Sequence, residues 1–562
     1  MSQKPGDDGS RFRPTVWISH GERPVPDPGR RWPFALAVVA LLAQMAVAMV
    51  TTAVQQTPTI DEPVYVGTAV VYLQQHSLRY NPEHPPLGKL VIGAGAAVAG
   101  PRLDPAVDGS QSAVGQRLLY ESGNDPWRLM LLARLPMILL TLVFAVVAFR
   151  FAREVAGTAG GLVALALYTF SPDLIAHGSL ATLDVPAAGF LLTSLWLLWR
   201  ARRRPLRYLP LAGLALGAAL ATKMSALPAV PVVAALAVLS VWGAGARPAG
   251  RRLAAGVAAA VGVVAVAVLV VWASYVAVDP RLVWTAPADV PVIHGWLGRV
   301  IDLLPFPAPY RDGVRIQLGY EDAGFGGYLF GDSYVGSKWY YLPAALLVKT
   351  PLGALVLWLA GSAAMVTVPR LRRAAPYLLL PAVVLLGAAT TGSRDFGVRY
   401  AIVLPMVLAV VAAAVMAAGR RWVRVVAVVL VLSVAASSLR TFPYYLPYSN
   451  EAFGGPSRTH LHLHDSNVDW GQDLGRLADR LRGRYPGERV WLVYKGSGVP
   501  SYYGIEAVDP LRVPPEQVRG LLVVSNSFVA RPDARLAALI DSSEPIDQVG
   551  HSITIFRRPA PG

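Results

Sequence analysis

The sequence contains no cysteine, and this absence excludes a disulfide framework, a thiolate metal site and a cysteine nucleophile. It is also poor in charge, because Asp, Glu, Lys and Arg make up 15% of its 562 residues, against about 25% in soluble domains. Hydrophobic residues make up 54%, and the mean hydropathy is +0.44. This composition excludes a soluble enzyme, a disordered chain, a collagen and a coiled coil. No Walker A motif and no GxGxxG that opens a helix after a strand occurs either.

Long apolar runs recur along the chain and predict a polytopic α-helical membrane protein. The first run, 34–54, carries no charge and would span about 30 Å as a helix, which is the thickness of the bilayer core. A secretory signal would be shorter, so we interpret this run as a retained anchor. Ten further runs bring the expected number of transmembrane helices to about eleven: 129–149, 160–176, 185–199, 208–222, 225–242, 253–275, 341–361, 376–391, 400–418 and 423–439. Residues 90–99 are too short to cross and are expected to lie in the interface or to re-enter.

The net charge of +16 is explained by topology. Basic clusters occur in the N-terminal tail and after every second run, all on the side of the N-terminus. The clusters after the runs are 150–153, 200–207, 247–252, 370–373 and 420–424. The positive-inside rule makes that side the cytoplasm of a multi-pass cell-membrane protein. The segment 279–338, on the other side, holds five Lys and Arg against seven Asp and Glu. The sequence therefore predicts no nucleic-acid partner.

Three regions follow from this topology. Residues 1–33 are polar, rich in proline and basic, and are expected to form a disordered cytoplasmic tail. Residues 34–439 form the membrane domain, with outside loops at 55–128 and 276–340. Residues 440–562 are expected to form a small extracytoplasmic α/β domain. Its periodicity predicts a helix over 474–485 and strands over 489–495, 520–527 and 552–558.

Acidic residues gather in the first outside loop. Asp61 and Glu62 come directly after the first run, and Glu83, His84 and Lys89 follow some twenty residues later. Two prolines beside His84 fix the backbone and interrupt any helix, which could hold Glu83 and His84 in one pose. Taken alone, Asp61 and Glu62 are also typical of a solvated helix N-cap at a membrane boundary.

Cations lie near the same face of the membrane. They are Arg134, Lys223, Lys349, Arg394 and Arg399, with Asp184 in a loop on that side. Ionisable residues at membrane depth cost about 2.5–3.5 kcal/mol each and usually face a cavity or a partner. Each one alone could snorkel or form a structural ion pair. Together they predict a polar pocket near the outer leaflet, suited to an anionic lipid headgroup.

Such a pocket favours transfer of a sugar from a polyprenyl phosphate. This reaction needs a carboxylate to take the proton of the acceptor hydroxyl, and Asp61 suits that role. It also needs Lys and Arg to stabilise the departing phosphate. In-line attack would invert the anomeric carbon. Two alternatives stay open: a transporter or flippase of lipid-linked sugars, and a non-catalytic sensor or scaffold.

The motifs resemble those of the GT-C glycosyltransferases. The similar family is family 39, which includes the protein O-mannosyltransferases and the aminoarabinose transferases of lipid A. The C-terminal part resembles a bacterial branch of phospholipid carrier-dependent glycosyltransferases. The matching segments are DE (61–62), NPEHPPLGK (81–89), AHGSLATLDVPAAGF (176–190), GLALGAALATKMSALP (213–228), YYLPAALLVKTPLG (340–353), FGVRYAIVLP (396–405), YSNEAFGGP (448–456) and DSNVDWGQDL (465–474).

This resemblance implies a polyprenyl-phosphate donor with a mannose-like sugar, and neither a metal nor another cofactor. It implies Asp61 as the catalytic carboxylate, with Glu62, Glu83 and His84 beside it. The residues implied to contact the donor phosphate are Lys89, Arg134, Lys223, Lys349 and Arg399. The acceptor stays open between protein, lipid and glycan, because the chain has HPPL where aminoarabinose transferases have KPPL and shows no β-trefoil pattern at its C-terminus.

The segment HLHLHDSNVDWGQD (460–473) allows several interpretations. A strand would place His460, His462 and His464 on one face, where they could bind a metal or simply form an exposed polar surface. The residues after them combine an aromatic ring with carboxylates and amides, as sugar sites do. With Asp184, the expected acceptor or sugar-binding residues are therefore Asp465, Asn467, Asp469, Trp470 and Gln472. Alternatively, Asp469 or Asp473 caps the following helix.

Overall fold

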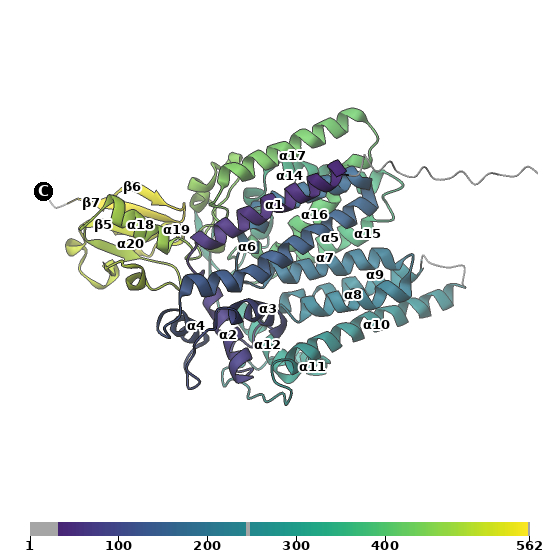
Figure 1. The fold of residues 1–562 in the computed structure, drawn as a ribbon, viewed down its shortest axis with the longest axis horizontal. Coiled ribbons are helices and arrows are strands. Elements are labelled where there is room, and N and C mark those ends of the chain that lie inside the picture. The colour runs from purple at the N-terminus through teal and green to yellow at the C-terminus, as the bar shows by residue number, and fades with distance from the viewer. Residues whose placement is uncertain (1–31, 243–247, 560–562) are drawn as a thin grey trace, which may run out of the picture.

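A computed structural model describes residues 32–242 and 248–559 of the chain. They form a bundle of helices with a small sheet domain at one end (Figure 1). The expected disordered tail, 1–33, lies almost wholly outside these residues. The polytopic α-helical fold and the small C-terminal α/β domain expected from the sequence are both confirmed.

The bundle is built from the predicted apolar runs. Its helices are α1 (Trp32–Gln55), α5 (Pro126–Thr169), α7 (Asp184–Ala201), α8 (Pro205–Leu220), α9 (Ala229–Trp242), α10 (Ala249–Val276), α13 (Tyr341–Lys349), α14 (Leu352–Thr367), α15 (Ala375–Ala389), α16 (Val403–Ala412) and α17 (Arg421–Thr441). Short 3-10 turns extend them at η2 (Met224–Ala226), η4 (Val398–Ala401) and η5 (Ala413–Ala417). Five of the described helices are long and apolar enough to cross a membrane by themselves, and α13 with α14, bent by 119°, makes a sixth candidate. The number of eleven crossings stays a prediction.

Helix α5 contains two of the predicted runs and turns back on itself. Gly157 has φ 79° and ψ −178°, a backbone conformation that interrupts the helix and favours glycine. The Tyr168 hydroxyl donates to the Thr141 carbonyl at 3.1 Å. The parts before and after Gly157 therefore run side by side in opposite directions, as two separate spans require.

Small residues let neighbouring helices of the bundle approach closely. A Cβ on Gly217 of α8 would lie 2.7 Å from the Ala267 carbonyl oxygen of α10. Such close backbone contact is the usual basis of helix association where both surfaces are apolar.

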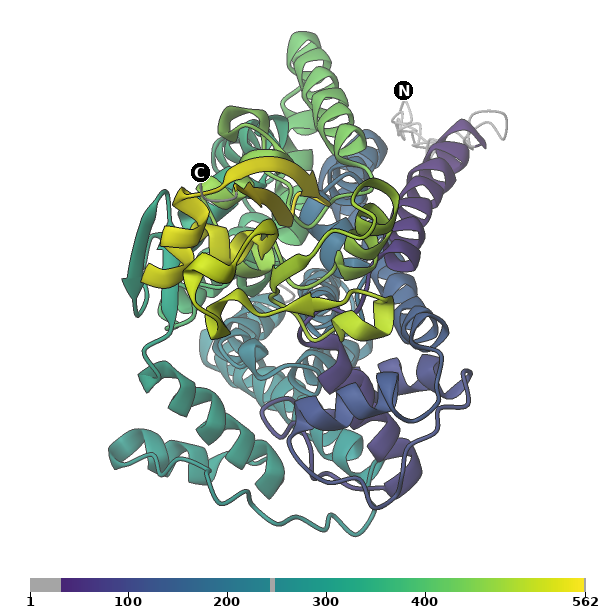
Figure 2. The same ribbon diagram turned by 90° about the vertical axis from the view of Figure 1, so that its left-hand side faces the viewer.

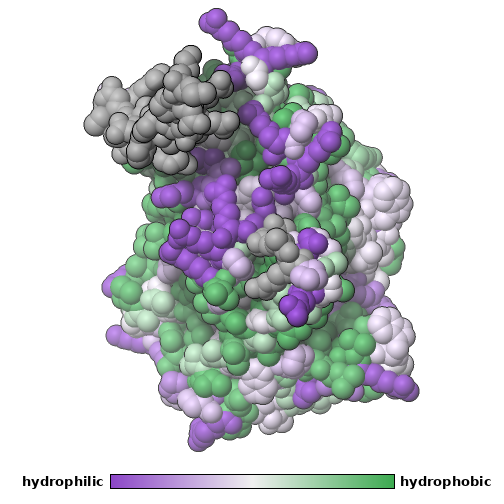
Figure 3. Space-filling view, turned by 90° about the vertical axis from the view of Figure 1, so that its right-hand side faces the viewer, coloured by the Kyte–Doolittle hydropathy of each residue, from purple (hydrophilic) through white to green (hydrophobic). Residues whose placement is uncertain are grey.

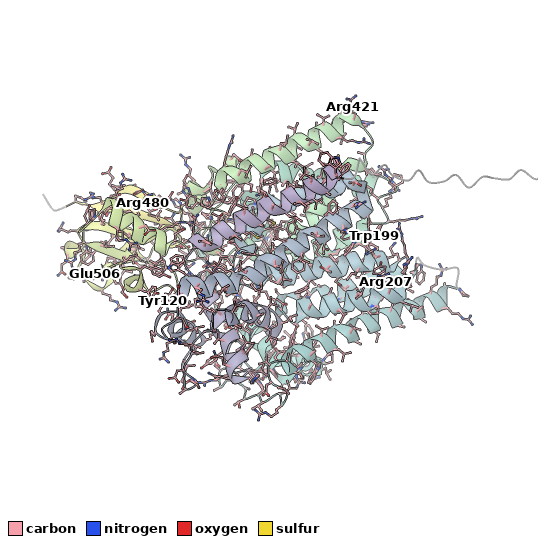
Figure 4. All side chains as sticks on the ribbon, viewed as in Figure 1. Tyr120, Trp199, Arg207, Arg421, Arg480 and Glu506 are labelled. Atoms are coloured by element: carbon pink, nitrogen blue, oxygen red, sulfur yellow. The ribbon has the colours of Figure 1, made fainter. Side chains whose placement is uncertain are left out.

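Charge separates the two ends of the bundle. Arg207 and Arg421 lie at the end opposite the sheet domain, whereas Arg480 and Glu506 lie on that domain (Figure 4). Seen end-on, the end opposite the sheet domain shows hydrophilic side chains gathered in the upper half of the view, with mostly apolar side chains around and below them (Figure 3). Its exposed basic residues include Arg203, Arg204, Arg207, Arg372, Arg373 and Arg421.

The two segments expected to form outside loops fold into short elements beside the sheet domain (Figure 2). The first loop forms α2 (Glu62–Gln75), α3 (Pro86–Ala97) and α4 (Gln111–Tyr120). Helix α3 includes most of the run 90–99 and packs against α2 and α5. Between spans lies α6 (Pro172–Gly178). The second loop forms α11 (Gly295–Leu303), α12 (Ala308–Gly319), η3 (Tyr320–Asp322) and a hairpin of β1 (Gly326–Leu329) and β2 (Asp332–Val335).

The C-terminal domain is a mixed five-stranded sheet in the order β4-β3-β5-β7-β6. Its strands are β3 (Val490–Val493), β4 (Ala507–Val508), β5 (Gly520–Ser525), β6 (Glu544–Val549) and β7 (Ile553–Arg558). Strand β3 is parallel to β4 and β5, and β7 is antiparallel to β5 and β6. Helix α18 (Leu474–Arg484) packs with the core of one face, and α20 (Ala534–Asp541) with the core of the other; α19 (Asn526–Ala530) follows β5 directly. The predicted helix and three strands are confirmed.

The strand expected through the alternating histidines is wrong. Residues 456–461 form a 3-10 helix, η7 (Pro456–Leu461), and Asp465–Asn467 form another, η8. His462 contacts the Phe453 carbonyl through Nε2, whereas His464 stacks on Tyr328. Among the described residues, no group of three or more His, Cys, Asp and Glu side chains is placed to hold a metal ion, so these histidines do not converge. Packing against the β1–β2 hairpin, which lies far away in sequence, overrides the alternation.

Candidate active site

Asp61 lies at the junction of the bundle and the C-terminal domain. It occupies the N-cap position of α2 but makes no capping hydrogen bond. Its Oδ2 instead accepts from Nη1 of Arg399 at 2.7 Å. The Asp61 side chain is 27% exposed, whereas that of Arg399 is 9% exposed. The pair joins the start of α2 to η4, the 3-10 turn that precedes α16.

Glu62, the next residue, is buried and makes different contacts. Its two carboxylate oxygens accept from Nε and Nη2 of Arg134 at 2.7 and 2.6 Å. Arg134 also donates to the carbonyls of Ala53, Gln56 and Thr57 at the end of α1. All of its nitrogens are thus engaged by protein acceptors, and none is left for a donor phosphate. This pair fastens the end of α1 to α5.

The HPPLGK segment forms a braced turn before α3. Lys89 donates to the Asn81 carbonyl, the Asn81 Oδ1 and the His84 carbonyl at 2.7, 3.2 and 2.7 Å, which uses all three of its N–H groups. Glu83 Oε1 accepts from Gln111 Nε2 at 2.7 Å. Lys89 and Glu83 therefore hold the loop in place.

His84 is turned inward at this loop. Its ring lies 5.8 Å from that of Tyr65, and its buried Nδ1 has no hydrogen-bond partner. Burial lowers the pKa of His84 well below its usual range, and the nearby Lys223 and Lys89 ammonium groups lower it further. The ring is accordingly neutral at physiological pH.

An amphiphilic cavity of about 210 Å³ opens between α7, η2, α15 and η4. Its polar end carries Asp184, Lys223, Glu321, Arg394, Arg399 and Tyr400. Its other wall is apolar and includes Leu191, Leu385, Ile402 and Val403. A cavity with this division suits a molecule with an anionic head and a hydrocarbon chain.

Three cations surround the Tyr400 ring at the polar end. Lys223 Nζ and the guanidinium carbons of Arg394 and Arg399 lie 5.5, 6.0 and 5.1 Å from its centroid. Lys223 donates to Asp184 Oδ1 at 2.5 Å, and Arg394 to Gln317 Oε1 at 2.7 Å. Each cation has more N–H groups than these contacts use. The buried Nε of Arg399 has no partner.

Lys349 lies apart from this cluster. It donates to the Leu446 and Asn467 carbonyls at 2.6 and 2.9 Å, and Asp173 Oδ1 lies 3.5 Å away. Its donors are thus used within the protein, as are those of Lys89 and Arg134. Of the five cations expected at the donor phosphate, Lys223 and Arg399 line the cavity.

The C-terminal DSNVDWGQD segment is buried at the domain junction. Trp470 is 1% exposed, and the Arg399 guanidinium lies over its ring at 4.2 Å. Gln472 contacts the backbone of Trp470 and Val468, and Asn467 accepts from Val398 N at 3.0 Å. Asp465 pairs with Lys495. Most polar groups of these side chains and the Trp470 ring are thus engaged by the protein, and their role in sugar binding stays a prediction.

Asp473, the alternative cap, occupies the N-cap position of α18 without a capping hydrogen bond. Its carboxylate instead contacts Arg476 and accepts from the Ser552 hydroxyl at 2.6 Å. Asp469 has one oxygen on Gly471 N at 3.1 Å and a second, buried oxygen without a partner.

Two polar residues of the cavity, Glu321 and Tyr400, have no role in the sequence analysis, and a third, Arg394, was expected in the polar pocket but not at the donor phosphate. Arg394 belongs to the same SRDFGVRY segment as Arg399, so its spacing from Arg399 was the available signal. Tyr400 follows Arg399 directly. Glu321 comes from η3 in the second outside loop, where no local pattern marks it.

Comparisons with known proteins give one family and several solved structures. Residues 38–279 match the model of the family described as dolichyl-phosphate-mannose-protein mannosyltransferase. No curated protein matches the chain. ArnT from Cupriavidus metallidurans bound to undecaprenyl phosphate is 16% identical over 92% of this chain and 97% of its own, with a TM-score of 0.47.

Two other solved structures are similar over less of their length. The protein O-mannosyltransferase Pmt1-Pmt2 complex of S. cerevisiae bound to the sugar donor is 17% identical over 44% of this chain and 33% of its own, with a TM-score of 0.35. The oligosaccharyltransferase of Archaeoglobus fulgidus in the apo form is 12% identical over 80% and 58%, with a TM-score of 0.43.

Proposed function

We propose from one premise: this chain is a membrane glycosyltransferase, and its residues 38–279 match the dolichyl-phosphate-mannose-protein mannosyltransferase family. The proposal is that it transfers a mannose-like sugar from a polyprenyl phosphate to an extracytoplasmic hydroxyl. The family match confirms the resemblance to the GT-C glycosyltransferases and the enzyme class expected from the sequence. Donor, sugar, acceptor and site residues are the proposal.

The contact between Asp61 and Arg399 supports this function most directly. It places a partly exposed carboxylate beside a cation that also lines the amphiphilic cavity. A base and a phosphate-binding group are thus adjacent at the polar end of a site with a hydrocarbon-compatible wall. Sugar transfer from a lipid phosphate needs these three features together.

In the reaction, Asp61 takes the proton from the acceptor hydroxyl. The hydroxyl oxygen attacks the anomeric carbon and forms the new glycosidic bond. The bond from that carbon to the phosphate oxygen breaks, and the lipid phosphate leaves with the electron pair. Attack opposite the leaving group inverts the anomeric configuration.

The leaving phosphate is held by Lys223, Arg394 and Arg399. Arg399 reaches both Asp61 and the phosphate. Its Nη1 binds Asp61, and its Nε has no partner among the described residues and is free for the phosphate. The polyprenyl chain follows the apolar wall that includes Leu191 and Leu385. Glu62, Lys89, Arg134 and Lys349 hold the surrounding backbone and do not contact the donor.

The orientation in the membrane follows from charge. The basic end of the bundle faces the cytoplasm, and the C-terminal domain with the site faces outward. A protein, lipid or glycan acceptor therefore reaches Asp61 from the extracytoplasmic side.

The test measures transfer by the full chain in proteoliposomes. The donor is radiolabelled polyprenyl phosphate mannose, and extracted envelope lipids, glycans and proteins serve as acceptors. Asp61→Asn should lose at least 100-fold in rate and keep its melting temperature. Asp104→Asn, an exposed aspartate of the same loop, is the matched control and should retain full activity. Full activity of Asp61→Asn, or movement of intact donor across the bilayer without a new covalent bond, would overturn the proposal.

A further inference from the structure

A single segment of the C-terminal domain contacts the backbone that precedes Asp61 and the backbone that precedes Arg399. Before Asp61, Thr57 N donates to the Gln472 carbonyl and Ile60 N to the Trp470 carbonyl, both at 3.0 Å. Before Arg399, Ser466 N donates to the Phe396 carbonyl at 3.1 Å. Residues 466–472 therefore hold two membrane-domain segments that are more than 330 positions apart in the sequence.

Trp470 connects this frame to the pair itself. Its carbonyl holds Ile60, the neighbour of Asp61, and its ring face lies 4.2 Å from the Arg399 guanidinium. The edge of His177 approaches the same indole, with centroids 6.0 Å apart. Because the indole is 1% exposed and contacts protein on both sides, it has little freedom to move.

The ring face compensates for an incomplete set of hydrogen bonds on Arg399. Among the described residues, only Nη1 has a protein acceptor, and the buried Nε has none. Hydrogen bonds alone thus leave the guanidinium plane free to turn about the Asp61 contact. A cation–π contact over an indole attracts the guanidinium and fixes its plane.

We infer that Trp470 is a positioning residue for Arg399, and that the extracytoplasmic domain thereby completes the active site of the membrane domain. This inference rests on the proposed function. Trp470 does not touch the substrate; it aims the free guanidinium edge at the position of the donor phosphate. A displacement of about 1 Å in such a group lowers rates by about 100-fold.

The test is a double-mutant cycle on kcat in proteoliposomes, with Trp470→Leu, Arg399→Lys and the double variant. If Trp470 acts through Arg399, Trp470→Leu lowers kcat by at least 10-fold in the wild-type background and by less than 2-fold when residue 399 is lysine. Trp470→Phe retains a ring face and should recover most of the loss. Equal losses in both backgrounds would overturn the inference.

A matched control separates positioning from domain stability. Trp491 is a fully buried tryptophan in the sheet of the same domain, where it donates to the Arg519 carbonyl and has no contact with Arg399. Trp491→Leu should lower the melting temperature while the folded fraction keeps its kcat. An equal loss of kcat in Trp491→Leu would show that Trp470 acts only through stability and would overturn the inference.

A structure of Trp470→Leu in nanodiscs gives a readout that does not depend on turnover. The expected result is a guanidinium displaced from its place beside Asp61. An unchanged Asp61–Arg399 pair in this variant would overturn the inference, whether or not the wild-type protein transfers sugar. Absence of transfer by the wild-type protein would contradict only the proposed function.

Discussion

Glu62 and Arg134 form a fully buried ion pair in which both carboxylate oxygens accept from the guanidinium. Asp61, one residue earlier, pairs with Arg399 and remains partly exposed. Two adjacent acidic residues thus have separate tasks, because the start of α2 directs one side chain into the bundle and the other toward the junction.

Loss of the buried carboxylate should destabilise the protein rather than alter its chemistry. Glu62→Gln leaves Arg134 buried without its counter-ion, which costs about 3–5 kcal/mol. We expect a clearly lower melting temperature in detergent, and for the folded fraction an unchanged donor KM. Glu488→Gln, which breaks the more exposed pair with Arg557, should leave the melting temperature unchanged. A stable but inactive Glu62→Gln would instead place Glu62 in the reaction.

Two of the buried lysines, Lys223 and Lys349, should respond differently to the same substitution. Lys223 lines the cavity, whereas Lys349 is held by the Leu446 and Asn467 carbonyls away from it. Lys223→Met should raise the donor KM by at least 10-fold, since a charged contact to phosphate contributes about 1.5–3 kcal/mol. Lys349→Met should lower the folded yield and leave the donor KM of the folded protein unchanged. Steady-state kinetics on matched folded fractions decides between these outcomes, and equal KM values in both variants would contradict the assignment.

Arg394 should bind the donor, although the family resemblance does not place it at the donor phosphate. It lines the cavity beside Tyr400 and is fixed by Gln317. Arg394→Ala should weaken the thermal stabilisation of the protein by undecaprenyl phosphate. The exposed Arg299 of α11 provides the control, and Arg299→Ala should behave as wild type. Identical stabilisation in both variants would remove Arg394 from the site.

Asp469 should make stability depend on pH. Burial raises its pKa to about 7, although the nearby Lys495 ammonium opposes this change. Between its unfolded pKa of 3.8 and about 7, the folded protein keeps a proton that the unfolded chain has lost. Stability is therefore lost as the pH rises through this range and is constant above it.

Asp469→Asn removes this dependence. The melting temperature of the variant should exceed that of the wild type by an amount that grows from pH 4 to pH 8. The corresponding difference in the free energy of unfolding has an upper limit of about 4 kcal/mol. Differential scanning fluorimetry at successive pH values measures the difference. Asp479→Asn on the exposed face of α18 is the control, since its side chain is 76% exposed. A difference that does not vary with pH would contradict the prediction.

Local sequence determined the elements of this protein. Apolar length defined the helices of the bundle, because a helix in lipid must be apolar over the thickness of the bilayer. Periodicity defined α18, β3, β5 and β7, because each buries one face in a local core. Charge placement gave the two ends of the bundle. The motif beginning at Asp61 was also evident, since ionisable side chains near the membrane carry a free-energy cost and therefore usually mark a functional site.

Tertiary structure alone decided which charges share the cavity. Lys89, Arg134 and Lys349 look equivalent to Lys223 and Arg399 in the sequence, yet their donors are used by carbonyls and carboxylates of other segments. The alternating histidines did not form a strand, because the β1–β2 hairpin packs on them. Trp470 covers Arg399 from a separate domain. Such contacts depend on the packing of distant segments, whereas sequence patterns report the burial and period of one segment at a time.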